Sequence, residues 1–175
     1  IEEPFDLGLG KGPGGGYSDC LPDNISMNLS LVAWNNSPSN NFLQKITAEV
    51  HGLEDAGWTS GSGTTFEHDS INYLKLPRDL KPGERLAIRL SVSIGFAKRD
   101  AYKFVEQLGK LKDKQQRIEV VYIVREGNKT KTKKLEKSDI NFYESYYPIY
   151  ESYLQQSCSS EKAKELLNIL RAKGQ

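Results

Sequence analysis

The stretch RLAIRLSVSIG, residues 85–95, alternates between two kinds of side chain without a break. One face carries Leu86, Ile88, Leu90, Val92 and Ile94, and the other carries Arg85, Ala87, Arg89, Ser91 and Ser93. A period of two residues is typical of a β-strand that buries one face. Just before it, KPGE at residues 81–84 predicts a turn of type II with Pro82 and Gly83 as its central pair.

The same alternation recurs on both sides of this strand. NISMNLSLVAW, residues 24–34, and FLQKITAEVHG, residues 42–52, each place apolar side chains at every second position. The seven turn-forming residues NNSPSNN join them, so we expect two neighbouring antiparallel strands. Further along, RIEVVYIVREGNKTKTKKLEKSDI, residues 117–140, is typical of a hairpin with its turn at residues 126–129.

Two segments show a helical period instead. Apolar residues recur at helical spacing in RDAYKFVEQLGKLKDK, which predicts a helix over about residues 99–113 that crosses between two strands. A leucine-rich stripe predicts a C-terminal helix over about residues 160–172. The segment between them is rich in tyrosine, and Pro148 predicts that it forms two short pieces rather than one helix.

These elements predict a mainly β fold, an immunoglobulin-like antiparallel β-sandwich with a crossover helix and a C-terminal helix. We expect a Gly-rich flexible arm over residues 1–22 and the sandwich over residues 23–140. A Tyr-rich helical tail over residues 141–175 is expected to pack on the sandwich. A single domain of this size agrees with a length of 175 residues.

The order NISMNLSLVAWNNSPSN, KITAEV, LPRDLKPGERLAIRLSVSI resembles immunoglobulin-like and fibronectin-type-III-like domains, where a Pro-Gly turn often precedes a long strand. The resemblance extends over residues 23–140. It also looks like the sandwich domains of larger bacterial envelope or membrane proteins. The Cys…Trp…Cys spacing of antibody domains is absent from the sequence. The resemblance implies a binding or structural role, and it transfers no individual residue.

The segment GKGPGG, residues 10–15, matches the pattern G-x-G-x-x-G. A dinucleotide-binding fingerprint needs a buried strand before the glycines and a helix after them. Here acidic residues and Pro4 precede the glycines, and YSDCLP follows them, so we interpret this stretch as an arm without nucleotide binding. Cys20 and Cys158 lie near opposite ends of the chain, and a bridge between them requires a fold that brings these ends together.

Few residues in the sequence suggest an active site. His51 and His68 both lie near acidic residues, but no G-x-S-x-G, C-x-x-C or H-E-x-x-H motif occurs. The carboxylates of Glu54, Asp55, Glu67 and Asp69 flank one Gly-rich loop and could gather around Ca²⁺, with ordinary surface carboxylates as the favoured interpretation. We expect no catalytic residue, no metal ligand and no cofactor.

Positive charge is concentrated between Lys98 and Lys137, where 13 Lys and Arg residues face 6 Asp and Glu residues. Within it, Lys129, Lys131 and Lys133 fall on one face of a predicted strand. Aligned lysines either follow the phosphates of an anionic partner or protect a sheet edge from pairing with another chain, and we favour edge protection.

Aromatic residues give a second set of candidates. Trp58, Tyr73 and the Tyr-rich tail with Tyr146 and Tyr150 could stack on sugars if they are exposed. Helical spacing along the tail favours packing against the core instead.

The hypothesis that fits these observations best is a non-catalytic domain for protein–protein interaction or assembly, part of a larger or membrane-anchored protein. The candidate interaction surface comprises Lys129, Lys131, Lys133, Trp58, Tyr146 and Tyr150. The alternatives are a carbohydrate-binding module and contact with nucleic acid or anionic lipid through the Lys98–Lys137 segment. The sequence contains no apolar run long enough to span a membrane. We expect an aqueous domain exposed on an envelope or membrane-associated protein.

Overall fold

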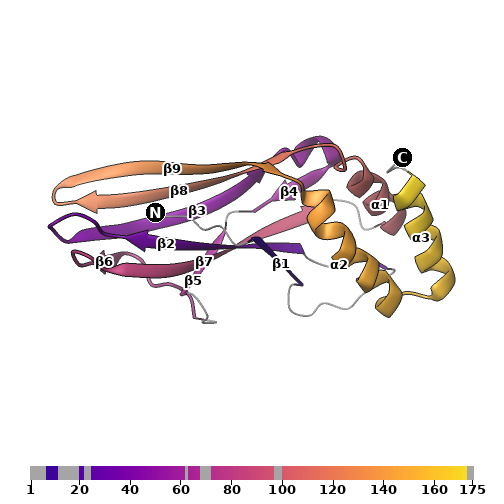
Figure 1. The fold of residues 1–175 in the computed structure, drawn as a ribbon, viewed down its shortest axis with the longest axis horizontal. Coiled ribbons are helices and arrows are strands. Elements are labelled where there is room, and N and C mark those ends of the chain that lie inside the picture. Colours follow the sequence, from indigo (N-terminus) through magenta and orange to yellow (C-terminus); the bar gives the residue numbers. More distant parts are fainter. Residues whose placement is uncertain are drawn as a thin grey trace.

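A computed structural model describes residues 7–11, 20–21, 25–61, 63–67, 72–96 and 100–172 of the chain. The described residues form two antiparallel sheets and three α-helices, and the helices gather at one end of an elongated molecule (Figure 1). The tip of the hairpin formed by β8 (Gln116–Glu126) and β9 (Lys129–Ile140) lies at the opposite end (Figure 1). The mainly β class and the two helices predicted from the sequence are therefore confirmed.

The two sheets differ in their order of strands. The first sheet runs β1 (Leu7–Lys11), β2 (Ile25–Trp34), β7 (Arg85–Phe96), with β4 (Trp58–Ser60) and β5 (Thr64–Glu67) both paired to the far side of β7. The second sheet runs β6 (Arg78–Leu80), β3 (Asn41–His51), β8 (Gln116–Glu126), β9 (Lys129–Ile140). A short 3₁₀ helix, η1 (Glu54–Ala56), follows β3.

The alternation in residues 85–95 determines the register of the first sheet. Leu90 of β7 lies opposite Leu29 of β2, and both side chains are fully buried. The turn before β7 is as predicted, since Gly83 has a φ of 76°, which glycine adopts without strain. The inward side chains of β2 and β7 form a core with those of β3 and β8, among them Met27, Leu31, Val92, Ile46 and Val120.

Helix α1 (Ala101–Gly109) connects β7 of the first sheet to β8 of the second, which confirms the predicted crossover helix. Asp100 caps it, because its side chain accepts hydrogen bonds from the backbone N–H groups of Tyr102 and Lys103. The apolar stripe of α1, including Phe104 and Leu108, is buried.

The C-terminal region contains two helices, α2 (Phe142–Ser157) and α3 (Ser160–Ala172). The prediction that Pro148 splits the first of these was wrong: α2 continues through it. Pro148 lies on the exposed side of α2, while Tyr146, Tyr150 and Leu154 on the other side are buried. We infer that this packing outweighs the single backbone hydrogen bond that proline removes.

The N-terminal segment also differs from its prediction. Residues 7–11, which we expected to belong to an irregular arm, form β1 and pair with β2 from Leu7 opposite Leu29 to Lys11 opposite Ile25. Gly8 and Gly10 disfavour a strand, so the alternation of Leu7 and Leu9 was not recognised as one. The remaining glycines, from Gly12 to Gly16, lie outside the described residues.

Candidate interaction surfaces

Three of the predicted surface residues lie in the core instead. Trp58, Tyr146 and Tyr150 are almost completely buried, so the prediction that they contribute to an exposed surface was wrong. Trp58 packs against Phe96, Phe104 and Phe142 with ring centroids 4.9–5.7 Å apart. The tyrosines of α2 continue this cluster, and their packing against the core agrees with the interpretation that the sequence favoured.

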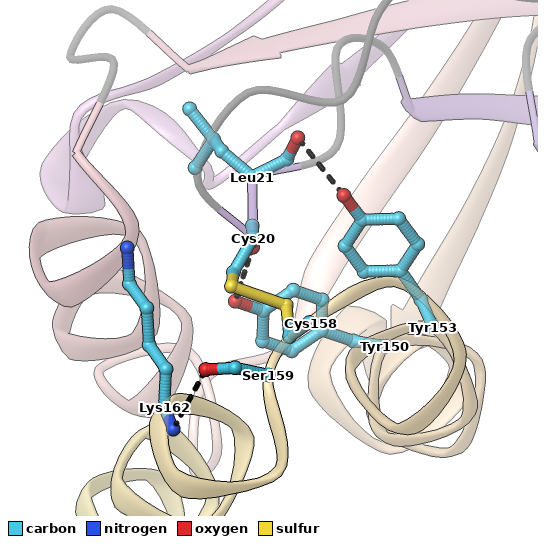
Figure 2. The surroundings of a disulfide bond; sticks show 7 residues. All are labelled: Cys20, Leu21, Tyr150, Tyr153, Cys158, Ser159 and Lys162. Atoms are coloured by element: carbon cyan, nitrogen blue, oxygen red, sulfur yellow. Dashed lines mark hydrogen bonds between the residues drawn. A yellow bond between two sulfur atoms is a disulfide. The ribbon is translucent and has the colours of Figure 1, made fainter.

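The tyrosines of α2 also bind the backbone of Cys20 and Leu21, between β1 and β2 in the sequence (Figure 2). Tyr150 donates its hydroxyl hydrogen to the carbonyl oxygen of Cys20 at 3.3 Å, and Tyr153 donates to that of Leu21 at 3.2 Å. Beside them Cys20 forms a disulfide with Cys158. The fold therefore brings these two cysteines together, which the sequence alone did not decide. Burial raises the pKa of Tyr146 and of Tyr150 well above the ordinary value, so both hydroxyls stay protonated in the folded chain.

The basic segment does not form one surface. Lys103 and Lys110 lie at the helical end of the molecule, whereas Lys129, Lys131 and Lys133 lie on β9, toward the far end (Figure 1). The charge that is continuous in the sequence is thus divided between two ends of the fold. A partner that contacts the whole Lys98–Lys137 segment at once would have to span the long axis of the molecule.

The three lysines of β9 share one face, as predicted, and this face turns toward the space between the sheets. Lys131 lies opposite Val124 and Lys133 opposite Tyr122, both on the inward side of β8. Within the described residues β9 pairs only with β8, so it is an edge strand. Glu126 forms ion pairs with Lys131 and Lys133, and the hydrogen bond from Lys131 lowers the pKa of the Glu126 carboxyl.

A groove of about 280 Å³ opens between the sheets next to these lysines. Its apolar lining comes from both sheets and consists of Ala33, Trp34, Leu43, Leu80 and Val124. Tyr122, Glu126 and Lys133 also line it, and burial raises the pKa of Tyr122. The groove therefore combines an apolar interior with charged groups on one wall.

One end of the groove is built by a buried network around Asn35. Its side-chain N–H₂ donates to the carbonyl oxygens of Leu80 and Ser39 at 2.7 and 2.8 Å. Its side-chain oxygen accepts from Asn41 and from the Ser37 hydroxyl, both at 2.8 Å. These bonds link the β2–β3 connection to β6, so NNSPSNN forms an ordered wall rather than only a turn.

The outer face of the first sheet carries a set of aromatic and arginine side chains that we define as the aromatic–arginine face: Trp34, Phe66, Tyr73, Arg85 and Arg89. The Arg85 guanidinium lies 4.8 Å from the Trp34 ring, and that of Arg89 lies 5.3 Å from the Phe66 ring. Tyr73 stacks on Phe66 at 4.9 Å and is 67% exposed, and Trp34 is 37% exposed.

Tyr73 was expected from the sequence as a sugar-stacking candidate, but this face as a group was not. Its members come from β2, β5, β7 and the segment after β5, and the strand register brings them together: Trp34 opposite Arg85, Phe66 opposite Arg89 and Tyr73 opposite Phe66. Only the outward position of Arg85 and Arg89 in the alternating strand could have indicated it.

The structure does not bring together those candidate catalytic residues and candidate calcium ligands that it describes. His51 is half-buried at the end of β3, the Glu54 carboxylate accepts from the N–H of Gly52 at 2.9 Å, and Glu67 pairs with Arg78. His68, Asp69 and the side chain of Asp55 lie outside the described part of the chain. Among the residues that the structure does describe, no three His, Cys, Asp or Glu side chains lie close enough to hold a metal ion.

Comparison with known proteins gives only distant structural likeness. No family model matches the chain, and no curated protein matches it either. A crystal structure of a protein from Archaeoglobus fulgidus aligns with a TM-score of 0.44 and 10% identity, over 78% of this chain and 92% of that one. In the described residues no helix has both the length and the apolar character needed to cross a membrane.

Proposed function

We propose that this chain is a non-catalytic, immunoglobulin-like interaction domain that binds a protein partner through its aromatic–arginine face. The order β1-β2-β7 packed against β3-β8-β9 supports the immunoglobulin-like assignment, because A-B-E faces C-F-G in such domains. The short strands between β3 and β7 differ from the simplest version of that fold, since both β4 and β5 pair with β7 and β6 pairs with β3.

The observation that carries the proposed function is the composition of the aromatic–arginine face. Trp, Tyr and Arg are the residues most enriched among the energetic hot spots of protein interfaces. Here two arginines are already stacked on rings, which holds their side chains in place before a partner arrives and reduces the entropy lost on binding. Tyr73 is more exposed than Trp34, so we assign it the role of anchor.

The Cys20–Cys158 disulfide supports the location expected from the sequence. Disulfides persist in oxidising compartments, where exposed domains of envelope or membrane-anchored proteins reside.

Affinity capture followed by binding measurements tests the proposal. The double variant Trp34→Ala/Tyr73→Ala should lose a partner that the wild-type chain captures from an extract of its source. With that partner purified, the variant should bind roughly 30-fold more weakly or worse, as expected when a hot spot is truncated. The matched control is Thr130→Ala/Thr132→Ala, two exposed residues on the outer face of the second sheet. Equal binding by both variants would contradict the proposed face.

A carbohydrate is the second candidate ligand, and the exposure of Tyr73 favours it. A flat, exposed ring supported from below by Phe66 is suited to stacking on a sugar ring. Binding of the wild-type chain to immobilised glycans, lost in Tyr73→Ala but retained in Arg85→Ala, would favour this alternative over a protein partner.

A further inference from the structure

The groove beside β9 has features of a ligand site of its own, although it shares Trp34 with the aromatic–arginine face. It lies between the two sheets, and its apolar lining includes Ala33, Leu43 and Leu80. Apolar pockets with a few convergent polar groups are the usual form of small-molecule sites. Since Asn35 ties one end wall into a hydrogen-bonded network, the groove is preformed.

The charges at the groove are unevenly matched. Lys129, Lys131 and Lys133 face the inter-sheet side, and of these three Lys133 lines the groove, where Glu126 is the acidic residue. Lys131 is the closer partner of Glu126. The Lys133 nitrogen lies 3.9 Å from a carboxylate oxygen of Glu126, which is beyond hydrogen-bonding distance. An anionic group at the mouth would therefore approach Lys133 more closely than Glu126 does.

The volume limits what fits. About 280 Å³ lies just below the range of roughly 300–1,000 Å³ typical of ligand pockets, and it equals the volume of roughly nine liquid waters. One short hydrocarbon chain fits this space, whereas the two chains of a diacyl lipid would not be enclosed.

We propose that this groove binds a small amphipathic anion, a short aliphatic chain that ends in a carboxylate. The chain lies between Leu43, Leu80 and Val124, and the carboxylate accepts hydrogen bonds from Lys133. Apolar contact supplies most of the affinity, and the lysine selects the anion over a neutral ligand of the same length.

Calorimetric titration with octanoate tests the site, with 1-octanol as the neutral ligand of equal length. We expect a dissociation constant of about 1 mM or lower for octanoate, which is reasonable for so small a ligand, and weaker binding of octanol. Lys133→Ala should weaken octanoate binding roughly fivefold and leave octanol binding unchanged.

Neighbouring residues supply the controls. Lys134 is the next residue on β9 but points to the outer face, where it pairs with Glu119 at 3.1 Å, so Lys134→Ala should bind octanoate like the wild type. Val124→Phe, which fills the groove, should abolish binding of both ligands, and thermal melting verifies that each variant is folded. The proposal is overturned if the folded wild type shows no binding up to about 10 mM octanoate. It is equally overturned if Lys133→Ala and Lys134→Ala bind octanoate alike, or if octanol binds as tightly as octanoate.

Discussion

The buried tyrosines of α2 show how a single residue can both fill the core and bind a distant segment of backbone. Tyr150 places its ring between Phe104 and Tyr153, and its hydroxyl reaches the carbonyl oxygen of Cys20. A tyrosine suits this place because its ring adds to the apolar core while its hydroxyl satisfies a polar group that would otherwise be buried alone. The same burial makes these hydroxyls difficult to ionise.

Stability should therefore fall at alkaline pH. The pKa of Tyr146 is raised in the folded chain, whereas a tyrosine in the unfolded chain ionises near its ordinary value of about 10. Above pH 10 the unfolded chain loses a proton that the folded chain keeps, so the free energy of unfolding falls by up to about 1.4 kcal/mol per pH unit for this group. Urea unfolding between pH 9 and pH 11.5 should show a shallower decline for Tyr146→Phe than for the wild type.

The matched control for this experiment is Tyr73→Phe, because Tyr73 is largely exposed. Its free energy of unfolding should decline with pH as that of the wild type does. If Tyr146→Phe and Tyr73→Phe declined with the same slope as the wild type, the burial of Tyr146 would be refuted.

The face assignment of β7 leads to a second prediction at the residue scale. Leu90 is fully buried and Ser93 is exposed on the same strand. Leu90→Ala should lower the free energy of unfolding by about 2–5 kcal/mol, the usual cost of a cavity in a packed core. Ser93→Ala should change it by about 0.5 kcal/mol or less. Denaturant titration of the two variants measures the difference, and comparable losses would mean that the strand faces are wrongly assigned.

At the scale of elements, β9 is the most exposed strand of the second sheet. Its residues 129–134 are all exposed, and only β8 pairs with it among the described strands. Such an edge offers unpaired backbone groups to another chain, and lysines along it oppose that pairing by mutual repulsion. The position of β9 agrees with the edge-protection interpretation, and its inward lysines also supply the charge of the groove.

Removal of these lysines should increase self-association. The triple variant Lys129→Ala/Lys131→Ala/Lys133→Ala loses the repulsion at the edge, and sedimentation velocity should reveal dimers or larger species at concentrations where the wild type is monomeric. A variant with alanine at Lys103, Lys110 and Lys164 removes the same charge from exposed helical positions and should sediment like the wild type. Equal self-association of both triple variants would show that net charge, rather than the strand edge, controls solubility.

Which elements could be predicted from the sequence depends on how local their determinants are. The strand at residues 85–95 and the helix α1 show their periods within their own residues, so both were found. The strand β1 was missed because two of its five residues are glycine. The break predicted at Pro148 was wrong because packing on the opposite side of α2 decided the outcome. The aromatic–arginine face and the groove depend on strand register and on contacts between sheets, which no local pattern reveals.

For the whole molecule, the disulfide joins segments that are 138 residues apart in the sequence. It ties the segment before β2 to the end of α2, next to the tyrosine hydroxyls that bind Cys20 and Leu21 (Figure 2). The helices are thereby attached to the sandwich both by packing and by a covalent bond. This arrangement leaves the outer face of the first sheet and the far end of the sandwich for binding.

Loss of the disulfide should destabilise the whole fold. The double variant Cys20→Ala/Cys158→Ala should lower the free energy of unfolding by about 2–5 kcal/mol, because a cross-link across so long a loop restricts the unfolded chain. Chemical denaturation of the variant and of the reduced wild type should give matching losses. A variant as stable as the oxidised wild type would contradict the pairing.

Site-specific photo-crosslinking tests the central claim, binding through the aromatic–arginine face, most directly. A photoreactive amino acid is placed at position 34 or 73 on this face, and at position 47 or 132 on the outer face of the second sheet. In an extract of its source, positions 34 and 73 should yield the same discrete protein adduct. Unlabelled wild-type chain should compete for it, and Trp34→Ala/Tyr73→Ala should not. Adducts that form mainly from positions 47 and 132, or that both competitors suppress equally, would contradict the account.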